Sequence, residues 1–429
     1  MSLIPETLST LSERIEAIWP DAVEWRRHLH RHPEVSFKEF ETTRWIVEKL
    51  EQWGYEVHKP CETGCVALLD GGQPAKTAAS KPTTTPDQTS SEPEFQVQSQ
   101  PMHEPAVIAL RADIDALPIQ EEGEAKKEFL SQNDGVAHCC GHDLHTSNLL
   151  GVARLLSEER ARVRGRVVLI FQAAEETLPG GARLLMESGL LQELKVDAIY
   201  GLHTTPFLEP GKITVREGRL MASPSEFTIE ITGKGGHAAA PHLAVDPIVT
   251  AAQVVTQLQT IVSRSTDPLE ATVVTVAKMQ AGTARNIIPE KATLEGTIRT
   301  FDIEKTREIF ARIQHISEHV TAAAGCSSQA GLIPGYPAVI NHPDTTKRLR
   351  NVAGSAMIEL DAPVMAGEDF AFYQQELPGT FFFLGSGSDE ADSRHTWHHP
   401  HYNVDERCLK TGMAVMAGLV PGMMPGIMP

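Results

Sequence analysis

Three apolar runs, each followed directly by acidic or histidine side chains, constrain the fold of this chain more than any other feature. The runs and the side chains that follow them are 107–112 with Asp113 and Asp115, 167–174 with Glu175 and Glu176, and 198–202 with His203. Helical patterns at 147–158 and 181–188 separate the runs, and right-handed crossovers of this kind build an open, largely parallel sheet. We therefore predict an α/β fold with a mixed, mostly parallel sheet flanked by helices. Ligands bind such sheets at the carboxyl ends of the strands, which is where these side chains fall.

A different pattern in the middle of the chain predicts a second domain. The length of 429 residues exceeds what one hydrophobic core usually supports. Strand and helix patterns follow one another at 227–232, 247–262, 272–279, 292–300 and 303–324. Two helices on one antiparallel sheet form a compact α+β domain. We therefore expect a discontinuous catalytic domain, 1–217 and 339–429, into which an α+β domain of residues 218–338 is inserted.

Two stretches of unusual composition lie outside these patterns. Residues 71–105 are rich in Thr, Ser, Pro, Gln and Glu, with too few apolar side chains to offset the entropy of ordering, so we predict a flexible insertion. Strand patterns at 64–70 and 107–112 flank this insertion, which predicts that it decorates a hairpin. After Val415 the chain is rich in Met, Gly and Pro, which predicts a frayed terminus or a docking strip.

The N-terminal region is expected to be mainly helical. Apolar residues recur at helical spacing over 8–19, 21–30 and 40–53. The histidines between His28 and Glu34 invite a metal-binding interpretation. A helix end, with cationic side chains near its carbonyl dipole, is the favoured one.

Charge and cysteine usage exclude some partners and predict a compartment. With 38 basic and 56 acidic residues the net charge is −18, so neither nucleic acid nor an anionic membrane is an expected partner. The six cysteines are scattered, which fits a reducing compartment. The N-terminus lacks the pattern of a signal peptide, and no apolar run is long enough to span a membrane. We therefore expect a cytoplasmic location.

The stretch from His138 to Thr146 holds three imidazoles, two thiols and a carboxylate around one glycine. Thiolate sulfur and neutral imidazole nitrogen are the preferred donors of zinc. A buried pair of free thiols with helix-capping polar residues is the alternative from this stretch alone.

The adjacent acids Glu175 and Glu176 extend the metal hypothesis. Neighbouring side chains at a strand end point in different directions, so one carboxylate can bind metal while the other faces an activated water and transfers its proton. A solvated acidic loop is the alternative, and the buried-type strand before the pair makes it less favoured. Five donors fit a site for two ions: Cys140, His142, Glu176, His203 and His398. Asp113 and Asp115 would then hold a ligand imidazole in its correct tautomer.

Several motifs in collinear order resemble one family. They lie at 110–118, 138–146, 171–176 with 180–182, 233–239, 286–290, 367–370 and 397–400. From about Trp25 to Cys408 the chain resembles the dinuclear-metal metallopeptidases and amidohydrolases that include aminoacylases, hippurate hydrolases and auxin-conjugate (indoleacetyl-amino acid) hydrolases. The resemblance implies a zinc-exopeptidase-like catalytic domain with an inserted lid and dimerisation domain.

The resemblance also implies roles for individual residues. Glu175 would be the general base and acid, beside the five metal ligands. His237 would reach a neighbouring subunit's active site and stabilise the tetrahedral oxyanion, whereas on its own it is a surface histidine in a tight turn. Arg285 and Asn286 would grip the substrate's free carboxylate, and Glu368 would lie near the metals.

The chain departs from the family's usual motifs at three positions. Cys139 stands where a small residue is usual, Leu144 where glycine is common, and Trp397 where an aliphatic residue precedes the last ligand. Every predicted ligand is intact, so these changes concern only pocket shape and metal preference.

The predicted function is metal-dependent hydrolysis of the amide bond of N-acyl amino acids or related carboxylate-bearing amides. Two divalent ions per subunit are expected, zinc or manganese, with cobalt or nickel also compatible. The resemblance also implies a homodimer, or a higher homo-oligomer, through the lid domain. Alternatives are a carboxypeptidase or dipeptidase with the same metals, and a catalytically silent metal-binding protein of the same fold.

Overall fold

The computed structural model describes residues 3–73 and 106–424, and these form two compact units. The first unit comprises the described parts of Met1–Glu217, Asn341–Leu360 and Glu376–Pro429. The second comprises Gly218–Ile340 and Asp361–Gln375. Among the helices of the described residues, none combines the length and the apolar content that crossing a bilayer requires.

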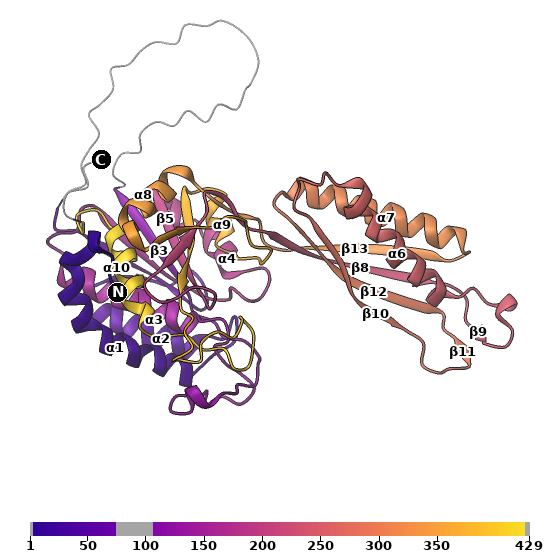
Figure 1. Cartoon of the computed structure of the whole chain (residues 1–429), viewed down its shortest axis with the longest axis horizontal. Helices are drawn as coiled ribbons and strands as arrows, with labels where there is room; N and C mark the ends of the chain where they lie inside the picture. Colours follow the sequence, from indigo (N-terminus) through magenta and orange to yellow (C-terminus); the bar gives the residue numbers. More distant parts are fainter. Residues whose placement is uncertain (1–2, 74–105, 425–429) are drawn as a thin grey trace, which may run out of the picture. The chain divides into compact units, whose positions relative to one another are not determined.

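A mixed eight-stranded sheet forms the centre of the first unit (Figure 1). In spatial order its strands are β1 (Glu56–His58), β2 (Cys65–Asp70), β4 (Arg166–Gln172), β3 (Val107–Asp113), β5 (Ala198–Thr205), β16 (Gly379–Gly385), β6 (Ile213–Val215) and β15 (Met357–Glu359). The four central strands are parallel to one another, while β1, β2 and β6 each pair antiparallel with a neighbour. This confirms the predicted mixed, mostly parallel sheet.

The central strands are buried on both faces, which is why they read as continuous apolar runs. The strand order also contains a switch point. The connection that leaves β3 runs to β4 on one side, and the connection that leaves β5 runs towards β6 on the other, so the two connections diverge at the neighbouring carboxyl ends of β3 and β5. A crevice at such a switch point is where open α/β sheets bind ligands.

Helices pack around this sheet and share its core. Those of the first unit are α1 (Ser12–Arg31), α2 (Phe40–Gln52), α3 (His142–Glu158), α4 (Gly181–Glu187), α5 (Leu190–Glu193), α8 (Pro343–Ala353) and α10 (Cys408–Leu419). Helix α3 begins five residues earlier than the predicted 147, because Gly141 adopts φ 95° at its N-cap and lets the ligand motif enter the first turn.

Two predictions about unusual stretches need correction. The described part of the C-terminal segment after Val415, which ends at Met424, is not frayed: Met416, Leu419, Val420 and Met423 are buried in the main core. Its mixture of Met and small residues fills the space against α1, α3 and α8, where flexible side chains adapt to an irregular surface.

The predicted hairpin around the insertion is also wrong. Strand β4 lies between β2 and β3 and pairs with both. An apolar strand forms more backbone hydrogen bonds and buries more apolar surface between two neighbours than at the edge of a sheet. The predicted flexible insertion 71–105 lies outside the described residues except for Gly71 to Gln73, whose backbone bonds to the segment before β4.

The second unit is a four-stranded antiparallel sheet with two long helices side by side on one face (Figure 1). Its strands are β10 (Val273–Ala281), β12 (Lys291–Thr300), β8 (Ser223–Thr232) and β13 (Ser327–Pro334), and its helices are α6 (Pro247–Ser265) and α7 (Ile303–Ala323). The remaining elements are β7 (Gly218–Met221), β9 (Gly236–His237), β11 (Ile287–Ile288), β14 (Val339–Asn341) and α9 (Ala371–Gln374). Alternating side chains of β8 and β12 face the helices and form a separate apolar core.

Candidate metal centre

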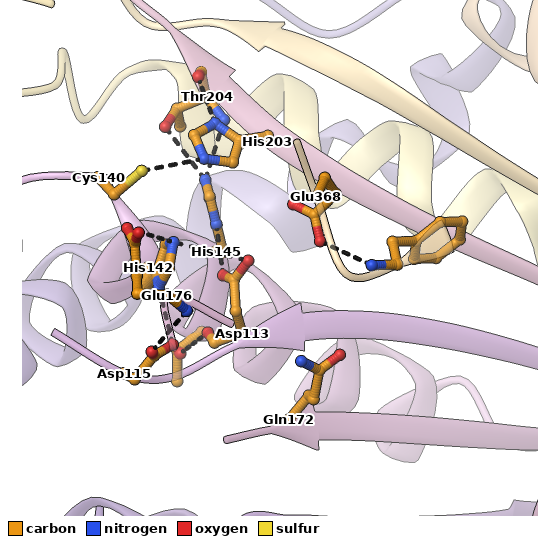
Figure 2. A network of polar contacts seen from close by, with 12 residues as sticks. Asp113, Asp115, Cys140, His142, His145, Gln172, Glu176, His203, Thr204 and Glu368 are labelled. Carbon is orange, nitrogen blue, oxygen red and sulfur yellow. Dashed lines mark hydrogen bonds and ion pairs between the residues drawn. The ribbon is translucent and has the colours of Figure 1, made fainter. Parts of the chain in front are cut away.

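Side chains from four segments of the first unit converge at the carboxyl ends of the central strands. Figure 2 shows Cys140, His142, Glu176 and His203 among them. His203 belongs to β5, the Glu175–Glu176 pair follows β4, Cys140 and His142 lie at the start of α3, and His398 lies in the loop after β16. Parallel strands end at one edge of the sheet, so these residues meet although the chain separates them widely.

Five donor atoms lie close enough to share metal ions. Cys140 Sγ lies 3.3 Å from His203 Nε2. Glu176 Oε1 lies 3.1 Å from His398 Nε2 and 3.8 Å from His142 Nε2. In each of three sets, all ligand atoms lie within 4.8 Å of one another: Cys140, His142 and His203; Cys140, Glu176 and His398; His142, Glu175 and Glu176. The overlap of these sets around shared residues fits two neighbouring cations.

His142 shows most directly that a cation belongs here. Its Nδ1 faces Asp115 Oδ1 at 3.1 Å, whereas its Nε2 is buried and has no hydrogen-bond partner among the described residues. A buried polar atom of this kind normally has a partner. Burial alone would lower the pKa of His142, but Asp113, Asp115 and Glu176 raise it to about 10. This excess negative charge is what a divalent cation would neutralise.

The surroundings of His203 and Cys140 also suit metal binding. His203 Nδ1 donates to the carbonyl oxygen of Thr204 at 2.7 Å, which leaves Nε2 as the atom that faces Cys140. Burial, reinforced by His145, keeps the pKa of His203 well below its usual value, so its imidazole is neutral as a ligand requires. Burial, together with Glu176 and Glu175, raises the pKa of the Cys140 thiol, so thiolate formation needs a nearby cation.

Two aspartates at the end of β3, Asp113 in the strand and Asp115 just after it, contact different histidines. Asp115 accepts from Ser36 Oγ at 2.7 Å and from the backbone N–H of Glu176 at 3.1 Å, besides facing His142. Asp113 Oδ1 lies 2.6 Å from His145 Nδ1, and its other oxygen lies 3.8 Å from His142 Nε2. Asp115 therefore orients the imidazole of His142, while Asp113 orients His145.

Unusual backbone conformations orient the candidate metal ligands. A Cβ atom on Gly141 would lie 2.4 Å from Thr204 Oγ1, so only glycine fits between Cys140 and His142. His398 has φ 63°, which a non-glycine residue adopts at a cost, and its N–H donates to the Cys139 carbonyl oxygen at 2.8 Å. Trp397 Nε1 donates to the Thr204 carbonyl oxygen at 2.9 Å, which anchors the same loop.

A buried ionic network beneath the metal centre was missed from the sequence. The ring nitrogens of His30 face Asp143 Oδ2 at 2.7 Å and Glu121 Oε1 at 2.6 Å. Arg26 Nε donates to Asp143 at 2.7 Å, and Lys126 Nζ lies 2.6 Å from Glu121. The helix end predicted in this region exists, since α1 ends at Arg31. His30, however, is fully buried and belongs to this network. Helical spacing places His30 on the buried face, and no local signal identifies its distant partners.

Four predicted site residues belong to the second unit. His237 is exposed on β9, which pairs with β11, and the backbone of Asn286 accepts from Ala238 N at 3.1 Å. Arg285 precedes Asn286 and is also exposed. One small pair of strands therefore brings His237, Arg285 and Asn286 together. Glu368 is buried, and its Oε1 accepts from the Phe370 backbone N–H at 2.9 Å.

An α/β sheet that gathers thiol, imidazole and carboxylate donors able to hold two cations, with a second glutamate beside the first, is the arrangement of a metallohydrolase. The sequence matches the model of Peptidase family M20/M25/M40 over residues 109–421. The chain belongs to this family, and the predicted class of metal-dependent hydrolase is confirmed.

Individual relatives cover nearly the whole chain. An N-acetyl-L-cysteine deacetylase of Bacillus subtilis is 37% identical over 408 residues, which are 94% of this chain and 87% of the relative. An IAA-amino acid hydrolase of Arabidopsis thaliana is 36% identical and covers 98% of this chain and 89% of its own. The crystal structure of a dinuclear metal-binding M20 peptidase from Bacillus subtilis superimposes with a TM-score of 0.75 at 34% identity, over 94% and 98% of the two chains.

Proposed function

We propose that this protein hydrolyses the amide bond of N-acyl amino acids or related amides that carry a free carboxylate. The observation that supports this most is the overlap of donor sets around His142 and Glu176, with Glu175 as an additional buried carboxylate. The named activities of the relatives, a deacetylase and an amino acid conjugate hydrolase, agree with such a substrate.

In this proposal the five ligands are Cys140, His142, Glu176, His203 and His398. They would hold two divalent cations, zinc or manganese, with cobalt or nickel also compatible with the donors. When bound, these cations polarise the amide carbonyl and lower the pKa of a water molecule. The mixture of one thiol, three imidazoles and one carboxylate suits zinc by donor type.

The protein's own groups move the proton. The Glu175 carboxylate accepts a proton from the attacking water and then delivers it to the departing amine nitrogen. His237 donates to the developing oxyanion, and Arg285 with Asn286 holds the substrate carboxylate through a guanidinium fork and an amide. The second unit would thus act as a lid, and pairing of two copies through it would supply His237 to the neighbouring site.

Free thiols support the proposed compartment. All six cysteines are unpaired, and four of them, Cys65, Cys139, Cys140 and Cys408, are buried with strongly raised pKa values because of burial. A protein that keeps six thiols reduced fits the cytoplasm.

The test compares the two adjacent glutamates. Glu175→Gln is expected to keep its metal, measured by elemental analysis, and to lose more than nine-tenths of its turnover of N-acyl amino acids. Glu176→Gln is expected to lose metal as well, and Glu187→Gln, an exposed carboxylate on α4, to behave as wild type. Turnover by Glu175→Gln above a tenth of wild type would refute the role of Glu175.

Substrate class is tested after metal reconstitution on a matched panel of N-acetyl, N-benzoyl and aryl-acetyl amino acids and dipeptides. Preference for dipeptides would identify a peptidase, and no hydrolysis of any member would identify a silent metal-binding protein. Arg285→Ala should raise KM for carboxylate-bearing substrates. An equal effect on a neutral amide would exclude the carboxylate role.

A further inference from the structure

Glu39 is a buried carboxylate near the metal centre that none of the proposed chemistry uses. Its side chain is fully buried at the start of α2, and the described residues form no ion pair with it. It does not cap its own helix, because Glu34 accepts from the backbone N–H groups of Glu41 and Thr42 at 3.2 and 2.8 Å. A buried carboxylate is costly, so its position needs another explanation.

The contacts of Glu39 lead to the turn that carries the proposed base. Oε1 accepts from the backbone N–H of Ala174 at 2.8 Å, and Oε2 accepts from the Thr63 hydroxyl at 2.7 Å. Ala174 directly precedes Glu175 and has φ 52°. A left-handed conformation is unfavourable for a non-glycine residue, so the surroundings must hold it.

Hydrogen bonds hold this turn on both sides of Glu175. Glu39 accepts a hydrogen bond from the backbone N–H of Ala174, and Asp115 Oδ2 accepts one from the backbone N–H of Glu176 at 3.1 Å. The Ala174 carbonyl oxygen accepts from Gly181 N at 2.9 Å. Two carboxylates from other parts of the chain therefore hydrogen-bond to the backbone N–H groups on either side of Glu175.

Packing alone does not determine the position of the turn. A pocket of about 120 Å³ that is partly open to solvent borders Thr63, Ala173 and Gly181, so side chains do not fill the space on this side of the turn. A strained segment beside an empty space can relax when its hydrogen bonds are removed. Burial and the nearby Asp115 raise the pKa of Glu39 to about 7, so a neutral side chain of the same shape is compatible with the site.

We propose that Glu39 is a positioning residue that keeps Glu175 aimed at the substrate by holding the Ala174 amide. This inference rests on the proposed role of Glu175 as base. Glu39 touches neither substrate nor metal, so its removal should lower kcat and leave KM and metal content nearly unchanged.

The test uses the full-length metal-loaded enzyme. Glu39→Ala is expected to lower kcat on an N-acyl amino acid at least tenfold, with KM within threefold and the metal content of wild type. Glu39→Gln keeps an oxygen for Ala174 and an amide for Thr63, so it should retain kcat within about threefold. Glu41→Ala, an exposed carboxylate two residues further along α2, is the matched control.

Two further measurements separate positioning from a general structural role. Glu39→Ala added to Glu175→Gln should cause no further loss of activity, because Glu39 acts through Glu175. Amide hydrogen exchange of the segment around Ala174 should accelerate in Glu39→Ala but not in Glu39→Gln, whether or not the enzyme is active.

The outcomes distinguish this inference from the proposed function. Unchanged exchange, kcat within threefold in Glu39→Ala, or loss of metal in proportion to kcat would each overturn the positioning role. If Glu175→Gln keeps more than a tenth of wild-type turnover, the proposed base fails, and faster exchange in Glu39→Ala would then show only that Glu39 holds the turn in place.

Discussion

Replacing Glu121 by glutamine should reveal how much the buried network contributes to stability. The Glu121 side chain is 3% exposed and meets three groups: His30, Lys126 and the backbone N–H of Ser131. Burial would raise the pKa of this carboxyl group, but His30 and Lys126 lower it from 4.5 to about 2. This difference corresponds to about 3 kcal/mol of stabilisation at neutral pH.

Because the pKa of Glu121 is lower in the folded than in the unfolded protein, its contribution to stability is present at neutral pH and is lost in acid. The stabilisation is complete above the unfolded value of 4.5 and is lost as the pH falls towards 2, with about 1.4 kcal/mol gone by pH 3.5. Glu121→Gln should therefore be less stable by about 3 kcal/mol at pH 7, because Lys126 stays buried without its partner. The difference between wild type and variant should shrink on acidification.

Denaturant unfolding between pH 7 and 3.5, in chelator so that metal release does not contribute, measures this difference. Glu122→Gln is the matched control, since its side chain is 64% exposed and pairs only with His401 among the described residues. A wild-type and Glu121→Gln pair whose stability difference stays constant over this pH range would show that the network does not lower the carboxyl pKa.

Three other changes test separate parts of the structure. Gly141→Ala should reduce the metal bound per chain, because the new Cβ would meet Thr204 Oγ1 at 2.4 Å; full metal content by elemental analysis would contradict the close fit. Asp115→Asn should weaken metal affinity about 10- to 100-fold by removing the charge behind His142, and a chelator titration that matches wild type would rule out this support. Met416→Ala should destabilise the protein by about 2–5 kcal/mol, since its side chain is 1% exposed in the core; an unchanged thermal midpoint would mean that the C-terminal segment does not contribute to the fold.

The sequence by itself determined the elements and the chemistry at their ends. Strands β3, β4 and β5 read as apolar runs because both faces are buried, and the acidic and histidine side chains at their ends were visible as candidate metal ligands. These features are local, since periodicity and residue type act over a few neighbouring positions. The α/β class and the metallohydrolase family follow from them.

Only the tertiary structure decided which distant groups meet. In the structure β4 lies between β2 and β3, the imidazole of His142 contacts the carboxylate of Asp115, and the C-terminal segment packs into the core. The bond from Glu39 to Ala174 joins positions 135 residues apart. Such contacts depend on how strands order themselves and on which polar groups must be satisfied once buried, and local spacing carries no information about either.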